Sequence, residues 1–311
     1  MYRLITSLDL PSNTISELQK RGFIYVEDLL NNLENLQKLS LDVSVIKKLL
    51  QFSENMALDV WQRESQKEGI STCCSLLDNI FENGVQCGVI TELSGASFSG
   101  KTQICMQLCI SVQLKKCHGG LNGRAIYIDT RSGISALRFS DFVKGCNRCQ
   151  KDFKLEENEA FRNIQVLLPM SLEEFLTVID NLKVEIKKIR NNKQVRLIIV
   201  DSLSMPILCT IGDPLKRPYY YSRILHELHQ LCLEYEVAIV ITNEVITQID
   251  KDGITYLAAA GGQYVSDYVH MKLELTSLGN NNFAIRIVKS PIRHEMSEKF
   301  RITEDGIRNV P

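Results

Sequence analysis

Residues 95–102 read Gly-Ala-Ser-Phe-Ser-Gly-Lys-Thr, a full match to the pattern G-x-x-x-x-G-K-[ST]. In such a loop, Gly95 and Gly100 let the backbone turn tightly and aim its N–H groups at phosphate oxygens. Lys101 can reach the β- and γ-phosphates of a nucleotide as a point charge, and the Thr102 hydroxyl can ligate Mg²⁺. The stretch therefore predicts a site for a nucleoside triphosphate.

The residues on either side of this loop fit the same interpretation. Residues 89–93 read as a short strand that enters the loop, and 102–108 open a helix. The N-terminal end of a helix favours an anion, because its free N–H groups and its dipole both point toward it. The residues expected to hold the nucleotide here are Gly95, Ala96, Ser97, Phe98, Ser99, Gly100, Lys101, Thr102 and Gln103.

A second acidic element follows about a hundred residues later. Residues 195–200 form an apolar run, rich in β-branched side chains, that ends at Asp201. Such a run predicts a strand buried on both faces of a mostly parallel sheet, and ligands bind at the carboxyl edge of such sheets. Together with Thr102, we expect Asp201 to hold Mg²⁺ through its water shell.

Composition limits the class of protein. The chain has 311 residues, 44% of them hydrophobic, which is enough for one large domain and a small one. A net charge of −1 excludes a globally basic nucleic-acid binder, so any such contact must be local. Ten cysteines and a start unlike a signal peptide predict a reducing, intracellular compartment. The apolar runs are strand-sized, so no membrane contact is expected.

The first 65 residues differ from the rest, because hydrophobic side chains recur there at helical spacing and no strand-like run occurs. We expect a helical N-terminal domain with its connector over 1–65 and a second domain over 66–311. Gly22 should end one short helix, and 42–44 could open the next. The periodic positions are Ile15, Leu18, Val26, Leu29, Leu30, Leu33, Leu36, Leu39, Val45, Ile46, Leu49 and Leu50.

Beyond residue 66, strand-like and helix-like segments alternate, which is typical of an α/β sheet flanked by helices. The last two strand candidates are close enough for an antiparallel hairpin, with Asn280-Asn281-Asn282 as its turn. The strand candidates are 89–93, 124–129, 164–168, 196–200, 237–242, 271–276 and 283–288. The main helix candidates are 102–114, 172–190 and 219–235.

The order of these motifs resembles the RecA-like core of the eukaryotic strand-exchange recombinases, over about residues 70–305. The phosphate loop is followed by Tyr127-Ile128-Asp129-Thr130 at a strand end, then Val200-Asp201-Ser202 and Ile241-Thr242-Asn243. Within that family the chain looks most like the C-type recombinase paralogues. The stretches that carry this likeness are 22–23, 27–30, 105–108, 112–114, 117–120, 195–201 and 289–291.

The resemblance implies a RecA-like phosphate-loop NTPase core that uses ATP and Mg²⁺ in homologous-recombination DNA repair, and possibly in meiotic recombination, in the nucleus. It implies that Arg138 stacks on adenine, a contact that suits a planar guanidinium. It also implies two DNA-facing stretches, 203–218 with Lys216 and Arg217, and 246–263 with Gly261 and Gly262. The alternative is that both stretches are plain surface loops, because their basic content is low.

The chain departs from the family pattern at the position of the catalytic base. Family ATPases carry a glutamate directly after the Asp-Thr pair to activate water, and this chain has Arg131 there. Arginine does not deprotonate in proteins, so it cannot serve as a base. Because loss of a positioned base costs ~10²–10⁴-fold in rate, we expect ATP binding with weak or absent hydrolysis.

Glu244 is the second departure, since the family usually has a glutamine there that senses the γ-phosphate. A carboxylate at this position would repel that phosphate unless it is protonated or paired. Three interpretations stay open: drift in a site that no longer hydrolyses ATP, a salt bridge between Glu244 and Arg131, and Glu244 as a relocated base.

Two absences bear on assembly. Recombinases that polymerise alone use a Phe-x-x-Ala tether in the connector, and here 52–55 read Phe-Ser-Glu-Asn. The helical domain also lacks an obvious Gly-x-Gly hairpin for gripping a DNA backbone. Both absences favour a hetero-oligomer with related paralogue subunits over a self-filament.

The cysteines Cys146 and Cys149 form a C-x-x-C pair without a second spaced pair. With Cys117 and His118 as speculative partners, the pair is weak evidence for zinc or for a redox centre.

Three functions follow from these patterns. The first is a nucleotide-locked adaptor that assists the main recombinase on single-stranded or branched DNA. The second is an active DNA-stimulated ATPase that performs strand exchange. The third is a generic phosphate-loop NTPase, such as a kinase or a transporter ATPase, and the order of the motifs disfavours it.

Overall fold

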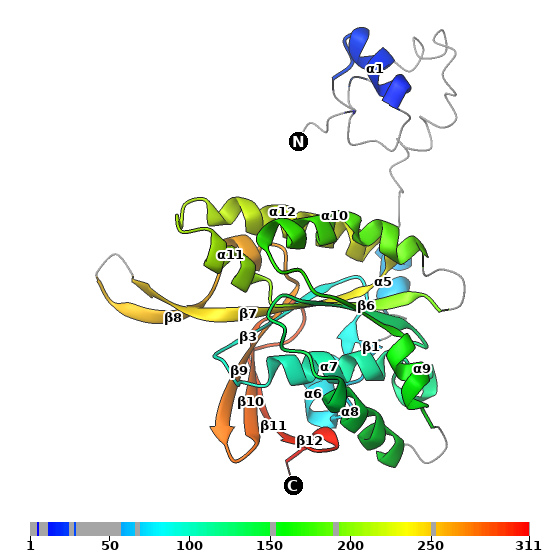
Figure 1. The fold of residues 1–311 in the computed structure, drawn as a ribbon, viewed down its shortest axis with the longest axis vertical. Coiled ribbons are helices and arrows are strands. Elements are labelled where there is room, and N and C mark those ends of the chain that lie inside the picture. Colours follow the sequence, from blue (N-terminus) through cyan, green and yellow to red (C-terminus); the bar gives the residue numbers. More distant parts are fainter. Residues whose placement is uncertain are drawn as a thin grey trace. The chain divides into compact units, whose positions relative to one another are not determined.

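A computed structural model describes residues 5, 12–24, 28, 57–65, 69–149, 154–188, 193–249 and 253–310. By its contacts the chain divides into two units, Met1–Gln66 and Lys67–Pro311. Each unit is considered by itself below (Figure 1).

The N-terminal unit contains helix α1 (Ser12–Lys20) and helix α5 (Ala57–Ser65). Gly22 has φ +89° and its N–H donates to the carbonyl of Gln19 at 3.0 Å. Glycine adopts this left-handed conformation without strain, so the predicted stop of a short helix at Gly22 is confirmed. The predicted helical positions from 26 to 50, the helix start at 42–44 and the 52–55 stretch lie outside the described residues.

The second unit is built on one large sheet with the strand order β12-β11-β10-β9-β3-β7-β6-β4-β5, and β8 pairs with β7 beside this path. A separate two-stranded sheet consists of β1 (Gly69–Ile70) and β2 (Val85–Gln86). The strands of the large sheet are β3 (Ile90–Gly95), β4 (Arg124–Asp129), β5 (Ile164–Leu167), β6 (Val195–Asp201), β7 (Ala238–Ile249), β8 (Thr255–Ala259), β9 (Met271–Gly279), β10 (Asn282–Lys289), β11 (Ser297–Thr303) and β12 (Gly306–Asn309).

The core of this sheet is parallel, from β9 through β3, β7, β6 and β4 to β5. The expected hairpin of β9 and β10 is antiparallel, and its turn residues Asn280 and Asn281 have φ +50° and +59°. The α/β fold class is thus confirmed. Two further antiparallel strands, β11 and β12, extend the sheet beyond the last strand candidate.

Helices cover both faces of the sheet (Figure 1). One face carries α10, α11 and α12, and the other carries α6, α7, α8 and α9. The bounds are α6 (Ser75–Ile80), α7 (Lys101–Ser111), α8 (Ala136–Cys149), α9 (Glu157–Arg162), α10 (Leu172–Lys188), α11 (Ser204–Thr210), α12 (Arg217–Tyr235) and α13 (Gly262–Ser266), with a 3₁₀ turn at Lys116–His118. None of the helices in the described ranges is both long and apolar enough to cross a bilayer.

Strand β6 shows why an unbroken apolar run suits this position. Leu197 and Ile199 enter the hydrophobic cluster under α7 and α8, whereas Ile198 and Val200 enter the cluster under α10 and α12. Successive side chains of a strand point to opposite faces, so a strand covered on both faces must be apolar throughout. This burial fixes the strand and thereby the position of Asp201 at its carboxyl end.

Candidate nucleotide site

The strand register brings the predicted site residues to one edge of the sheet. Gly95 at the end of β3 lies opposite Glu244 of β7, and Asp129 at the end of β4 lies opposite Asp201 of β6. Residues from four separate parts of the sequence therefore meet where parallel strands end, which is the usual ligand edge of such sheets.

The loop between β3 and α7 depends on its two glycines. Gly100 precedes α7 with φ +94°, and a Cβ on Gly95 would contact the carbonyl oxygen of Leu275. Phe98 at the tip has φ +63° and is 94% exposed. The Ser99 hydroxyl is buried and has no hydrogen-bond partner within the described part of the chain. A buried hydroxyl of this kind fits a loop that is shaped for a polar ligand.

Lys101 begins α7 and turns back into the loop. Its Nζ donates to the carbonyl oxygens of Gly95 at 2.6 Å and Ala96 at 2.9 Å, and lies 3.8 Å from Glu244 Oε2. Burial lowers the pKa of Lys101, and the carboxylates of Glu244 and Asp201 oppose that shift. A ligand with negative charge would stabilise the ammonium form, so Lys101 is suited to a phosphate.

Asp201 accepts hydrogen bonds from three hydroxyls. Thr102 and Tyr127 donate to Oδ2, each at 2.7 Å, and Thr242 donates to Oδ1 at 2.5 Å. Burial raises the pKa of Tyr127 well above its ordinary value, so this phenol stays a donor. The structure thus brings together the predicted Mg²⁺ pair, Thr102 and Asp201. The roles of Tyr127 and Thr242 were not predicted, because neither residue type signals a metal site in a sequence.

Asp129, two residues before Arg131, uses its carboxylate to accept hydrogen bonds from the backbone. Asp129 accepts from the N–H of Arg131 and from the N–H of Ile134, both at 2.9 Å, and it is almost fully buried. Asp129 therefore shapes the turn after β4. This turn directs the side chain of Arg131 toward β7.

Arg131 and Glu244 form an ion pair, with 2.5 Å between Nη1 and Oε1. The Glu244 side chain is 11% exposed and that of Arg131 is 38% exposed. The backbone N–H of Glu244 donates to the hydroxyl of Ser204 on α11 at 3.1 Å. This bond holds the backbone of Glu244 in place. Of the three interpretations of Glu244, the paired one describes this geometry. Glu244 lies between two cations, Arg131 and Lys101.

Arg138 on α8 has several partners inside the protein. Its Nε donates to Gln103 Oε1 at 2.7 Å, and its other nitrogens donate to the carbonyls of Thr303 at 2.7 Å and Glu304 at 2.9 Å. The guanidinium also lies over the ring of Phe142, 4.3 Å from its centroid. The two residues expected near the nucleotide, Gln103 and Arg138, are thus in contact with each other and with the β11–β12 turn.

The two stretches expected to face DNA are more ordered than loops. Residues 204–210 form α11, Lys216 is exposed, and Arg217 Nε donates to the Ile211 carbonyl at 2.9 Å. The second stretch is a β-hairpin of β7 and β8, which projects from the sheet (Figure 1). Part of the stretch 246–263 is therefore paired strand rather than loop, since Ile246 to Ile249 pair with Ala258 to Thr255.

Gly261 and Gly262 end the second stretch at the start of α13. Gly261 has φ +79°, and a Cβ there would lie 3.3 Å from the Tyr221 ring. Gly262 has φ +50° with open space around its α-carbon. The structure accounts for Gly261 by packing against Tyr221 of α12, the helix that Arg217 begins.

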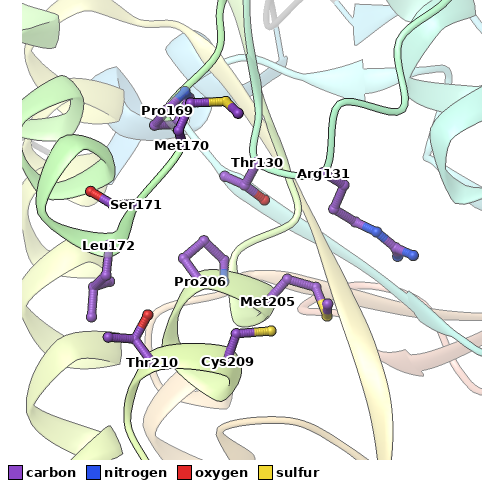
Figure 2. Close-up of a pocket in the computed structure, with 10 residues that line it drawn as sticks. All are labelled: Thr130, Arg131, Pro169, Met170, Ser171, Leu172, Met205, Pro206, Cys209 and Thr210. Carbon is purple, nitrogen blue, oxygen red and sulfur yellow. The ribbon is translucent and has the colours of Figure 1, made fainter.

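A pocket of about 250 Å³ lies beside the site, at the ends of β4 and β5 and against α11. In Figure 2, residues 169–172 lie on the left, and the Arg131 side chain on the right points away from them. The pocket shares Arg131 with the nucleotide site, but the loop residues 95–102 do not line it. Its lining residues are Thr130, Arg131, Pro169, Met170, Ser171, Leu172, Met205, Pro206, Cys209 and Thr210.

The cysteines give no metal centre. Cys117 Sγ lies 3.3 Å from His118 Nδ1, whereas Cys146 and Cys149 lie on α8. Within the described ranges, no group of three or more His, Cys, Asp or Glu residues could hold a metal ion. The speculative zinc set of Cys117, His118, Cys146 and Cys149 is therefore not assembled there.

Comparison with known protein families gives one finding. A family model described as Rad51 matches residues 63–310, which is most of the chain and nearly all of its second unit. The match includes the phosphate loop, Arg131, Asp201 and Glu244.

Proposed function

The chain belongs to the Rad51 family, and on that premise we propose that it is an ATP-binding subunit that acts as a nucleotide-locked adaptor. Proteins of this family act in homologous recombination, bind ATP with Mg²⁺ and work as oligomers on DNA. The proposed adaptor binds related paralogue subunits and assists the main recombinase on single-stranded or branched DNA. Its proposed setting is the nucleus, in break repair and in meiotic recombination.

One observation carries this proposal, namely the ion pair of Arg131 and Glu244. Arg131 occupies the position where the family has its general base, and a guanidinium holds its protons at any physiological pH. Glu244 is the candidate for a relocated base, but its Oε1 is engaged by Arg131 and its Oε2 lies 3.8 Å from Lys101. Because both of its oxygens already face cations, neither is free to accept a proton from an attacking water.

The residues fit ATP and Mg²⁺. The fit rests on the buried Ser99 hydroxyl without a described partner and on the cation of Lys101 in the loop. It rests also on the hydroxyl and carboxylate of Thr102 and Asp201, 2.7 Å apart, since Mg²⁺ prefers oxygen ligands. When bound, ATP supplies a polyanion that attracts cations from more than one protomer.

The charges of the site can accommodate that polyanion without loss of the ion pair. Lys101 is held by two neutral carbonyls and by a weaker 3.8 Å approach to Glu244, so its ammonium can exchange those partners for phosphate oxygens. Glu244 can meanwhile stay with Arg131, where the atoms are 2.5 Å apart. Arg131 thereby neutralises a carboxylate that would otherwise repel the ligand.

The candidate DNA contacts support a helper better than a strand-exchange enzyme. Lys216 is an exposed cation, whereas Arg217 is tied to the Ile211 carbonyl and Gly261 is packed on Tyr221. Phosphate contacts dominate the affinity of proteins for nucleic acids, and each needs a free cation or donor. We therefore assign only Lys216 as a phosphate contact of this chain in its proposed complex.

Single-turnover release of γ-phosphate from bound ATP tests the proposal. The full chain with its partner subunits is assayed with and without single-stranded DNA, and bound nucleotide is quantified in parallel. We expect the wild type to retain ATP. The double variant Arg131→Glu with Glu244→Gln, which has the family residues at both positions, should release phosphate about 10²-fold faster or more.

Two further variants separate the alternatives. Lys101→Ala should weaken both ATP binding and partner binding, and complexes that persist unchanged in this variant would contradict the nucleotide lock. DNA-stimulated release by the wild type, abolished in Glu244→Gln, would instead establish an active ATPase whose base has moved to β7.

A further inference from the structure

Three polar or charged side chains meet on the face of the large sheet that α10 and α12 cover. Glu92 of β3 lies opposite Lys272 of β9 in the strand register, with 3.3 Å between Oε2 and Nζ. Asn243 of β7 donates from Nδ2 to Glu92 Oε1 at 2.8 Å. Ile90 and Ile241, two residues earlier on β3 and β7, enter the hydrophobic cluster under α10 and α12, and alternate side chains of a strand share a face. The polar cluster is thus built into this face of the sheet.

The same asparagine also holds the base of the β7–β8 hairpin. Asn243 Nδ2 donates a second hydrogen bond, to the carbonyl oxygen of Ala260 at 2.7 Å. Ala260 is the residue directly after β8, and its N–H donates to the carbonyl of Glu244 at 2.8 Å. The next residue, Gly261, packs on the ring of Tyr221. Both backbone polar groups of Ala260 are therefore bonded to β7, which fixes the point where the returning arm of the hairpin leaves the sheet.

This cluster is poorly suited to stabilise the fold as such. Glu92 and Asn243 are fully buried, and the Lys272 side chain is 14% exposed. Burial removes the solvation of a carboxylate, and a single ion pair rarely recovers that free energy in full. Asn243 Oδ1 is also buried, and it has no hydrogen-bond partner among the described residues. What the directional bonds of the cluster do is fix one arrangement of β3, β7 and the hairpin.

The bonds of Asn243 are separate from those of the nucleotide site. Thr242 and Glu244, the residues on either side of it, have side chains that bond within the nucleotide site. Asn243 points to the other face, because successive side chains of a strand alternate. Its partners Glu92 and Ala260 lie outside the phosphate loop. A change of partners at the phosphate loop therefore leaves the bonds of Asn243 in place.

We propose that Asn243 is a positioning residue that holds the β7–β8 hairpin in one orientation whether or not a nucleotide is bound. The dependence of the hairpin on Asn243 follows from the hydrogen bonds alone, whereas its independence of the nucleotide rests on the proposed binding of ATP. Tyr256 and Leu257 of β8 are exposed on this hairpin. A hairpin held in this way presents them to a partner both before and after ATP binds.

Amide hydrogen exchange, followed by mass spectrometry on the full chain, tests the proposal because it reports local opening. The wild type is compared with and without the non-hydrolysable analogue AMP-PNP and Mg²⁺. We expect exchange in peptides that cover 255–260 to change by less than about threefold, while exchange in the loop 95–102 slows. Slowing of the hairpin beyond that limit would overturn the proposal. Unchanged exchange in the loop would contradict the proposed nucleotide binding, and the variants below would still decide the role of Asn243.

Variants separate positioning from general stability. Asn243→Leu loses both bonds of Nδ2, so exchange over 255–260 should become at least about fivefold faster while exchange in β4 and β6 stays near that of the wild type. Asn243→Ala, which adds no bulk, should give the same result, and melting curves confirm that both variants are folded. The matched control is Asn163→Leu, which removes another buried asparagine, bonded to Gln113 at 3.2 Å, and should leave the hairpin unchanged. A smaller increase in the hairpin, or an equal increase in β4 and β6, would overturn the proposal.

Discussion

Removal of the Arg131–Glu244 ion pair has an effect that can be calculated from its surroundings. Two unit charges about 4 Å apart attract by about 4 kcal/mol at an effective dielectric constant of about 20. The Arg131 side chain is 38% exposed, so solvent screens part of this attraction. Lys101 lies 3.8 Å from the same carboxylate and still compensates it when Arg131 is replaced. We therefore expect a coupling free energy of about 1–2 kcal/mol, below the 3–5 kcal/mol of a fully buried pair.

A double-mutant cycle measures this coupling. Arg131→Met, Glu244→Gln and the double variant are unfolded in urea and followed by far-ultraviolet circular dichroism. Tryptophan fluorescence is unsuitable, because the chain's one tryptophan, Trp61, lies in the N-terminal unit. Additive effects, with a coupling under about 0.3 kcal/mol, would refute the reasoning that the pair is a partly buried interaction.

A matched control comes from an exposed pair on the sheet. Arg286 Nη2 lies 2.6 Å from Glu274 Oε2, with side chains 52% and 37% exposed. The same cycle on this pair should give about 0.2–1 kcal/mol, and the value should fall with added salt. The coupling of Arg131 with Glu244 should depend less on salt, because only one of its partners is open to solvent.

Three further outcomes are expected. Gly145→Ala places a Cβ against the backbone carbonyl of Asp305 and should destabilise the fold by about 1–3 kcal/mol in urea unfolding, whereas Gly133→Ala, with open space around it, should change stability by less than about 1 kcal/mol. Lys101→Ala should weaken ATP binding by about 10- to 100-fold in equilibrium titration, because charge-assisted hydrogen bonds contribute about 1.5–3 kcal/mol. The alkylation rate of Cys73 by iodoacetamide should reach half its maximum near pH 7, since its pKa is lowered to about 7. Because the folded pKa of Cys73 is below its unfolded one, the contribution of Cys73 to stability should grow from pH 7 toward pH 9 and be lost as the pH falls through 7. Half-maximal alkylation near pH 9 would contradict the lowered pKa.

The sequence was sufficient for the parallel core of the fold, since central strands such as β4 and β6 are apolar runs buried on both faces. It was insufficient for β11 and β12, because β11 is mostly polar with Phe300 as its one buried side chain, and β12 has only 4 residues. The hairpin of β7 and β8 was taken for a loop. Its arms do contain strand-forming residues such as Ile246, Ile249 and Tyr256, but the family resemblance assigned this stretch to a DNA-facing loop.

In the candidate site, too, some features could be predicted from the sequence and others could not. The phosphate loop and Asp201 were identifiable because their chemistry demands fixed residue types at fixed spacing. The ion pair of Arg131 and Glu244 was one of three open interpretations, because their contact depends on the register of strands far apart in sequence.

Strand β7 continues without interruption from the nucleotide site into the hairpin. Glu244 directly precedes Val245, where pairing with β8 begins. The 5 residues Thr255–Ala259 are thus already fixed in a ladder, and fixing one residue otherwise costs about 1–2 kcal/mol of conformational entropy. A partner that binds this hairpin meets a preorganised surface, so its affinity is not reduced by the entropy of ordering these residues.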